Sequence, residues 1–130
     1  MNAAKDILLV DDDREIRDMT ALLLSGDGHS VRTAGSGEEA LYLVHEQLPG
    51  LVLLDINMPG MDGWEVLRLL KEDDATAGVP VVMFSIRFEL REKLHAMQRG
   101  AVDYITKPFD TEGLLRRVEA VLQQPAGDAA

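Results

Sequence analysis

The sequence contains no cysteine. Disulfide frameworks, thiolate zinc sites, iron–sulfur clusters and cysteine nucleophiles are therefore excluded. No apolar run approaches the ~20 residues that a membrane-spanning helix needs. The N-terminal stretch MNAAKD also has none of the hydrophobic character of a secretory signal. We therefore expect a cytoplasmic protein that does not bind membranes.

Basic side chains are also in short supply. The chain has 13 Lys and Arg against 23 Asp and Glu, which gives a formal net charge of −10. A surface of this sign repels nucleic acid and anionic lipid, so we expect no direct binding of either. The imbalance lies in residues 1–86, whereas residues 87–123 are close to neutral. The acidic residues of the first two thirds are therefore candidates for a functional role.

The 130 residues, of which 46% are apolar, are enough for one domain with its own core. Apolar runs alternate with amphipathic stretches over residues 1–123, which we take as this domain. The remaining residues 124–130, with the sequence QPAGDAA, are expected to form a disordered tail or linker.

The alternation predicts five strands and five helices. The strands are expected at residues 7–10, 30–34, 51–54, 79–84 and 102–106. The helices are expected at residues 14–25, 36–48, 64–73, 88–99 and 110–123. Strands that read as unbroken apolar runs indicate burial on both faces, as in a parallel sheet. We therefore predict an α/β fold, a doubly wound five-stranded parallel sheet with helices on both faces.

Polar side chains follow four of the predicted strands. They are Asp11, Asp12, Asp13, Asp55, Asn57, Ser85 and Lys107. Because the carboxyl ends of parallel strands share one edge of a sheet, these groups should surround one pocket. Clustered carboxylates repel one another, and Mg²⁺, which prefers oxygen ligands, relieves that repulsion. A lysine and a hydroxyl beside them suit the oxygens of a phosphoryl group.

Four motifs at these positions resemble a known family. They are LVDDD at residues 9–13, DINMPGMDG at 55–63, Ser85, and GAVDYITKPF at 100–109. In this order and spacing they resemble the receiver domain of two-component response regulators, of the chemotaxis Y protein type. The resemblance covers about residues 5–123 and implies the flavodoxin-like (βα)₅ fold.

The resemblance implies that Asp55 is the phosphoacceptor in a phosphorelay. Asp12 would bind Mg²⁺ directly and Asp11 through water, while Asp55 and the backbone carbonyl of Asn57 would complete the metal site. The phosphoryl donor would be a histidine kinase or a phosphotransfer protein. Such a domain catalyses only its own phosphorylation and dephosphorylation, and is not an enzyme in the usual sense.

The resemblance also implies a switch. Ser85 and Lys107 would bind the phosphoryl group, and movement of Ser85 would let Tyr104 turn inward. The fourth and fifth helices and the fifth strand would then present a changed surface to a downstream partner, or to a second copy in a phosphorylation-dependent dimer. The peptide between Lys107 and Pro108 is often cis in this family.

The two residues that directly follow Ser85, Ile86 and Arg87, are candidates for setting the rate of dephosphorylation. The family usually has Ala or Gly where this chain has Ile86. Ile86 could shield the acyl phosphate from water and slow its loss, or simply pack against Phe88 or Tyr104. Arg87 could reach the site or extend into solvent.

Another reading treats Asp11 as the nucleophile of a haloacid-dehalogenase-type phosphatase, because residues 11–13 satisfy its Asp-x-Asp motif. That family expects Thr or Val where this chain has Glu15, so the phosphatase is the weaker hypothesis. A phosphate-independent adaptor is not favoured either, since the complete set of receiver residues is present. The histidines at positions 29, 45 and 95 share no ligand spacing, and we expect them at the surface.

Overall fold

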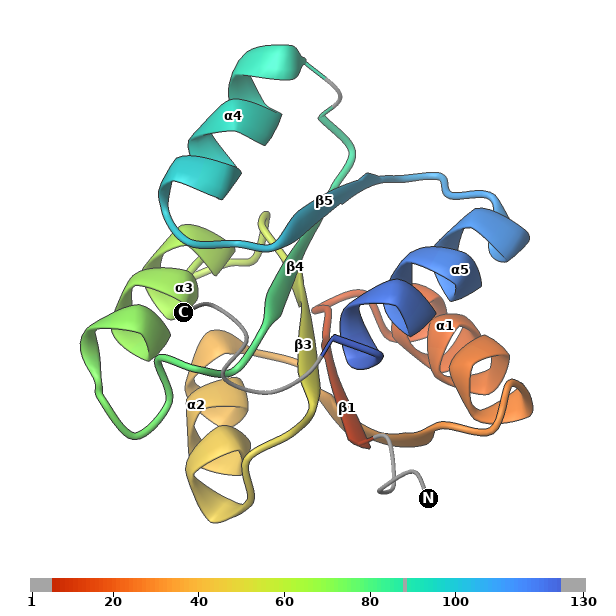
Figure 1. Cartoon of the computed structure of the whole chain (residues 1–130), viewed down its shortest axis with the longest axis horizontal. Helices are drawn as coiled ribbons and strands as arrows, with labels where there is room; N and C mark the ends of the chain where they lie inside the picture. Colours follow the sequence, from red (N-terminus) through yellow and green to blue (C-terminus); the bar gives the residue numbers. More distant parts are fainter. Residues whose placement is uncertain (1–5, 88, 125–130) are drawn as a thin grey trace.

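The computed structural model describes residues 6–87 and 89–124. Strands and helices alternate along the whole of this part of the chain, as predicted (Figure 1). The strands are β1 (Asp6–Val10), β2 (Ser30–Ala34), β3 (Leu51–Asp55), β4 (Val81–Ser85) and β5 (Asp103–Thr106). The helices are α1 (Arg14–Gly26), α2 (Gly37–Glu46), α3 (Gly63–Glu72), α4 (Leu90–Gln98) and α5 (Thr111–Leu122).

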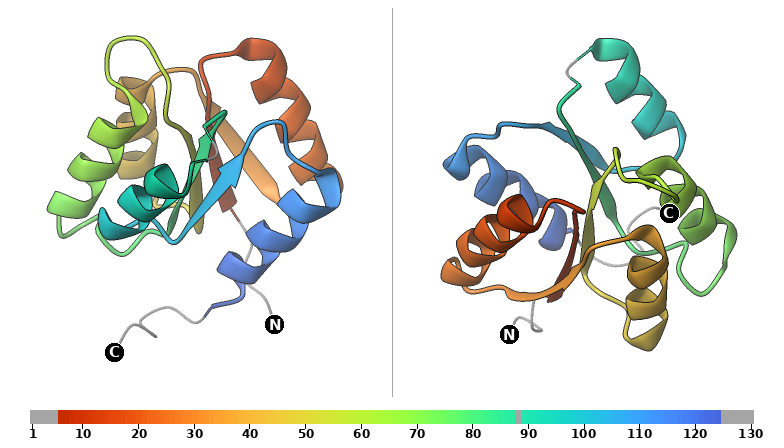
Figure 2. Two further views of the ribbon diagram at one scale, coloured as in Figure 1. Left: turned by 90° about the horizontal axis from the view of Figure 1, so that it is seen from above. Right: turned by 180° about the vertical axis from the view of Figure 1, so that it is seen from behind.

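The five strands form one sheet in the order β2-β1-β3-β4-β5, and every neighbouring pair is parallel. Helices α1 and α5 cover one face, whereas α2, α3 and α4 lie on the other (Figures 1 and 2). This arrangement confirms the predicted doubly wound sheet. It also brings the carboxyl ends of all five strands to one edge.

The core has two layers, one on each face of the sheet. Successive side chains of a strand point to opposite faces, so Ile7 pairs with Leu51 on the α1–α5 side. Leu8 pairs with Val52 on the α2–α3 side. All four side chains are fully buried, and each buried aliphatic side chain stabilises the fold by roughly 1.5–3 kcal/mol. Burial on both faces explains the unbroken apolar runs of the strands.

Short polar side chains begin most of the helices. Asp13 accepts a hydrogen bond from the backbone N–H of Ile16 and so caps α1. Ser36 caps α2 in the same way, because its Oγ accepts from the backbone N–H of Glu39. The Glu39 carboxylate in turn accepts from the Gly35 N–H. These two caps place the starts of α1 and α2 close after the ends of β1 and β2, so the first two loops at the functional edge are short.

No element boundary differs from prediction by more than two residues. Strand β4 begins at Val81, two residues later than expected, because Pro80 has no N–H and the Val79 N–H donates to Thr76. Helix α4 begins at Leu90, and the predicted start at Phe88 lies outside the described residues, as does almost all of the predicted tail. No described helix is both long enough and apolar enough to cross a membrane.

Candidate functional site

Three carboxylates meet at the carboxyl edge of the sheet. Asp11 directly follows β1 and Asp55 ends β3, and these two strands are neighbours. Asp11 is fully buried and Asp55 is 4% exposed, whereas Asp12 lies at the surface. One oxygen from each of the three lies within 4.8 Å of the others. The structure therefore brings together the acidic residues that the sequence placed at strand ends.

Lys107 extends from the end of β5 into this cluster. Its Nζ donates to Asp11 Oδ2 at 2.9 Å and to Asp55 Oδ1 at 3.3 Å. The ammonium also lies 4.8 Å from the centre of the Phe84 ring, a geometry that favours a cation. The Lys107–Pro108 peptide is cis, as the resemblance implied. One ammonium faces three carboxylates, so the cluster retains excess negative charge.

The surroundings of Asp55 change its acidity. Burial, and to a smaller extent the nearby Asp11 carboxylate, raise the pKa of Asp55 to about 7, although Lys107 and the Asn57 N–H act in the opposite direction. At neutral pH the site therefore favours a proton or a bound cation. The residues present fit Mg²⁺, because their ligand atoms are hard oxygens within reach of a single ion.

The loop after β3 lies directly over the Asp55 backbone. The Asn57 N–H is 3.4 Å from Asp55 Oδ1, while the Asn57 side chain is exposed. Gly63 donates its N–H to the Ile56 carbonyl at 2.8 Å, and any Cβ at position 63 would collide with the Asp55 carbonyl oxygen. Met58 is buried in the core beneath this loop. Backbone packing therefore fixes the position of the Asp55 carboxylate.

Ser85 and Tyr104 meet through the backbone of Arg87. The buried Ser85 Oγ accepts from the Arg87 N–H at 3.0 Å, and the Tyr104 hydroxyl donates to the Arg87 carbonyl at 2.8 Å. Tyr104 is only 3% exposed, so its ring lies inward. Burial raises the pKa of Tyr104 above its usual value, which keeps the hydroxyl protonated as a donor.

The side chains of Ile86 and Arg87 are exposed. Ile86 is 67% exposed, which is inconsistent with packing against Tyr104, and Phe88 lies outside the described residues. Arg87 is exposed as well and acts through its backbone N–H and carbonyl. Sequence reasoning missed this main-chain role because backbone groups carry no residue-specific signal.

A family model for the response regulator receiver domain matches residues 7–119 of this chain. The chain belongs to this family. DNA-binding response regulator MtrA of Mycobacterium tuberculosis is 41% identical over 118 residues, which cover 91% of this chain and 50% of MtrA. The chain spans about half the length of the curated relatives it matches.

Solved receiver structures resemble this receiver domain closely. Chemotaxis protein CheY4 of Vibrio cholerae superposes with a TM-score of 0.86 at 30% identity, over 92% of this chain and 99% of that one. The receiver domain of NtrX from Brucella abortus gives 0.85 at 38% identity, over 92% and 100%. These matches confirm the receiver fold and a role in two-component signalling, and they do not favour the phosphatase. Receiver domains of response regulators are not classical enzymes.

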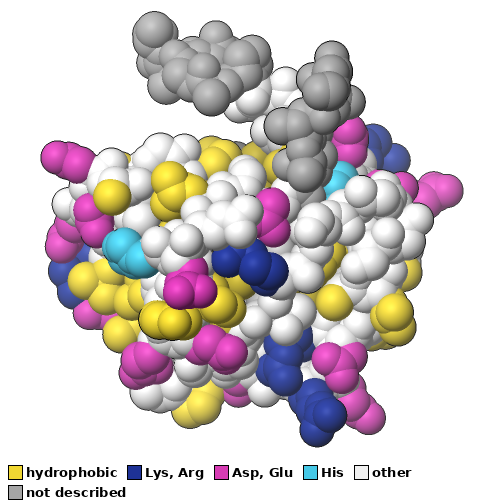
Figure 3. Space-filling view, turned by 90° about the horizontal axis from the view of Figure 1, so that it is seen from below, with side chains coloured by type: hydrophobic (Ala, Val, Ile, Leu, Met, Phe, Trp, Pro, Cys, Tyr) yellow, Lys and Arg dark blue, Asp and Glu magenta, His cyan; other side chains and the backbone are white. Residues whose placement is uncertain are grey.

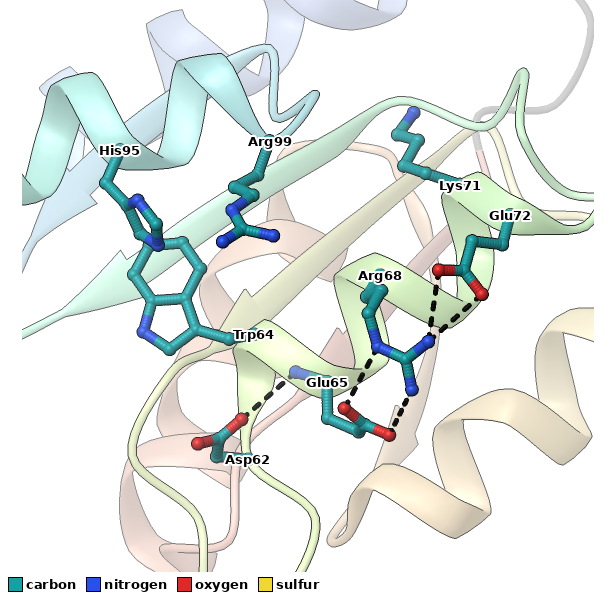
Figure 4. A pocket seen from close by; sticks show the side chains of 8 residues that line it. All are labelled: Asp62, Trp64, Glu65, Arg68, Lys71, Glu72, His95 and Arg99. Atoms are coloured by element: carbon teal, nitrogen blue, oxygen red, sulfur yellow. Dashed lines mark hydrogen bonds and ion pairs between the residues drawn. The ribbon is translucent and has the colours of Figure 1, made fainter.

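A separate pocket of about 500 Å³ lies between α3 and α4 of this receiver domain (Figure 4). Trp64, near the start of α3, contacts His95 of α4 edge-on at 4.5 Å between ring centres. Arg68 is bound on both sides, by Glu65 and by Glu72. The whole lining holds three acidic side chains (Asp62, Glu65, Glu72) and three basic ones (Arg68, Lys71, Arg99), so the pocket lacks the excess charge found at Asp55. The carboxylate cluster around Asp55 is therefore the better candidate for the functional site.

The prediction that all three histidines lie at the surface is wrong for His29. Its side chain is only 3% exposed and lies near Asp27 and Glu119. The residue is buried because α5 packs over the connection between α1 and β2, a contact between segments ninety residues apart. The local sequence Asp27-Gly28-His29 gives no indication that His29 is buried.

Proposed function

We propose that this receiver domain accepts a phosphoryl group on Asp55, from a histidine kinase or a phosphotransfer protein. The hydrogen bonds that the carboxylate oxygens accept favour Asp55 over Asp11 as the phosphoacceptor. Asp11 accepts from the Asp13 N–H through Oδ1 and from Lys107 through Oδ2. The Lys107 and Asn57 contacts of Asp55 both fall on Oδ1, so Oδ2 accepts no hydrogen bond from the described residues. Asp55 therefore has an oxygen available to attack phosphorus.

Asp11, Asp12, Asp55 and the backbone carbonyl of Asn57 are the proposed Mg²⁺ ligands. When bound, the ion would neutralise charge that collects on the phosphoryl oxygens during transfer. Phosphoryl transfer depends mainly on placement and on neutralisation of charge. In this chain, the buried position of Asp55 supplies the placement, and the Lys107 ammonium, 3.3 Å from Asp55 Oδ1, supplies positive charge.

Lys107 and Ser85 are the proposed ligands of the phosphoryl group. Once Asp55 carries a phosphoryl group, the Lys107 ammonium can shift from Asp55 Oδ1 to one of the phosphoryl oxygens. The Ser85 hydroxyl can donate a hydrogen bond to a second phosphoryl oxygen. Turning Ser85 would weaken its bond with the Arg87 N–H. Because the Arg87 carbonyl accepts from Tyr104, this movement would be transmitted to β5.

The surface formed by α4, β5 and α5 is the proposed output surface. Tyr104 lies on β5, and Arg117 of α5 donates to its backbone carbonyl at 3.0 Å. On α4, Leu90 and Leu94 are 68% and 53% exposed. Exposed leucines beside the switch suit a downstream protein or a second phosphorylated copy of this chain.

We further propose that residues 1–123 form the receiver domain of a cytoplasmic protein, with residues 124–130 as a tail or linker. The domain would act only on its own phosphorylation state and would not itself bind nucleic acid or membranes. On the face drawn in Figure 3, Lys and Arg side chains are interspersed with acidic and apolar ones. This mixture, together with the net charge of −10, opposes binding to a polyanion.

Incubation with acetyl phosphate, with and without Mg²⁺, tests the proposed phosphoacceptor. We expect the mass of one phosphoryl group to be added only with Mg²⁺, and peptide mapping after borohydride trapping to place it on Asp55. An Asp12→Asn variant should be phosphorylated at least about tenfold more slowly, as expected for a metal ligand. Phosphorus on Asp11 would instead support the phosphatase.

Ile86 is expected to prolong the life of the acyl phosphate. Its exposed side chain directly follows Ser85, where it can hinder the approach of water once phosphate is bound. An Ile86→Ala variant should lose phosphate roughly three to ten times faster, as measured by intact mass over time. Leu90→Ala is the control, because Leu90 is equally exposed but lies on α4. Equal lifetimes in Ile86→Ala and the parent would contradict this role.

A further inference from the structure

A second cluster of possible metal ligands lies at the opposite edge of the sheet from Asp55. Asp27 caps the C-terminal end of α1, His29 directly precedes β2, and Glu119 lies in the second half of α5. Figure 1 shows the α1–β2 connection and α5 on the same side of the sheet. Since all strands are parallel, the start of β2 lies at the amino edge and Asp55 at the carboxyl edge. The two clusters are therefore separate.

The imidazole ring of His29 is buried and has no hydrogen-bond partner among the described residues. Its side chain is 3% exposed, and neither Nδ1 nor Nε2 forms a hydrogen bond with any described residue. Its backbone is fixed, because the His29 N–H donates to the Leu24 carbonyl at 3.2 Å. Buried ring nitrogens nearly always have a partner, since an unpaired one is destabilising. The position of the ring therefore indicates a ligand between it and its neighbours.

The distances around His29 suit a shared cation. Nε2 lies 3.6 Å from Asp27 Oδ2 and 3.7 Å from Glu119 Oε1, beyond hydrogen-bond range. Two ligand atoms bound tetrahedrally to one Zn²⁺, at ~2.0–2.2 Å each, are separated by about 3.4 Å. The Asp27 and Glu119 side chains are 43% and 42% exposed, so they can adjust. Solvent can supply a further ligand.

We propose that Asp27, His29 and Glu119 bind a transition-metal dication of the Zn²⁺ type. An imidazole nitrogen among the ligands favours such an ion over Mg²⁺ or Ca²⁺, which prefer oxygen. Two carboxylates match its charge. The ion links α5, part of the proposed output surface, to the α1–β2 connection.

Zn²⁺ titration of the untagged full chain tests this site. A chromophoric chelator reports Zn²⁺ binding, and excess Mg²⁺ occupies the cluster of Asp11, Asp12 and Asp55. We expect one Zn²⁺ per chain and a higher melting temperature in the metal-bound protein. His29→Gln and Glu119→Gln should each weaken binding at least about tenfold and remove the thermal shift.

His45→Gln is the matched control, because His45 is an exposed histidine that already pairs with Asp73. Its Zn²⁺ affinity should equal that of the parent. Because the Glu119 side chain is partly exposed, the Glu119→Gln variant should fold normally. It therefore tests the site even if the His29→Gln variant fails to fold. Absence of Zn²⁺ binding to the parent overturns the proposal. So does Zn²⁺ binding that Glu119→Gln leaves unchanged.

Discussion

An Asp55→Asn variant is expected to lose phosphorylation completely and yet to unfold at a higher temperature than the parent at pH 8 without Mg²⁺. Both effects come from the same carboxylate. Asparagine has no anionic oxygen to attack phosphorus, so no acyl phosphate forms. It also has no charge to be repelled by Asp11 or to be desolvated beneath the loop that follows β3.

The pH dependence of this stabilisation follows from the pKa of Asp55. The ordinary value is 3.8, and the folded protein raises it to about 7. Between these values the folded state keeps a proton that the unfolded chain has released. The parent therefore loses stability as the pH rises from about 4 to about 7. A shift of this size corresponds to at most about 4 kcal/mol, and after relaxation of the site we expect about 1–3 kcal/mol.

Thermal unfolding from pH 4 to pH 8 measures this difference. The variant and the parent should melt together below pH 4 and diverge up to about pH 7, by roughly 4–10 °C. Mg²⁺ should raise the melting temperature of the parent more than that of the variant and so reduce the gap. Asp18→Asn is the control, because its exposed carboxylate on α1 should leave stability almost unchanged. A variant that melts below the parent at pH 8 without Mg²⁺ would contradict this account.

Replacement of Gly63 by alanine is expected to destabilise the fold by about 3 kcal/mol or more. The added Cβ would overlap the Asp55 carbonyl oxygen and lie 2.7 Å from the Ile56 Cα, and both are backbone atoms that cannot rotate away. The loop cannot simply open, because the Gly63 N–H donates to the Ile56 carbonyl at 2.8 Å. The Asp55 carboxylate would move with its backbone.

Urea denaturation with and without Mg²⁺ measures the effect of Gly63→Ala. The midpoint should fall, and phosphorylation from acetyl phosphate should slow because the phosphoacceptor is displaced. Gly26→Ala is the matched control: no atom lies within 4 Å of a Cβ there, and the residue ends α1, where alanine favours the helix. The control should be neutral or slightly stabilised. An unchanged midpoint for Gly63→Ala would show that the loop can relax.

The order of strands and helices could be predicted because it depends on local periodicity. The boundary at β4 could not, since it depends on Pro80 and on a turn hydrogen bond from Val79 to Thr76. The grouping of Asp11, Asp55 and Lys107 was predictable, because parallel strands bring their ends to one edge. Their roles remain predictions. The inward position of Tyr104 was not predictable, because it depends on a hydrogen bond to the Arg87 backbone.

The sequence by itself determined the alternating α/β order, the family, and the acidic, hydroxyl and amino groups that meet at one edge of the sheet. These features follow from residue type and from spacing within short segments. Only the tertiary structure decided which oxygen of Asp55 accepts no hydrogen bond from the described residues, and that His29 is buried against Glu119. The physical reason is that burial and pairing depend on contacts between distant segments. Such contacts are fixed by the packing of the whole core.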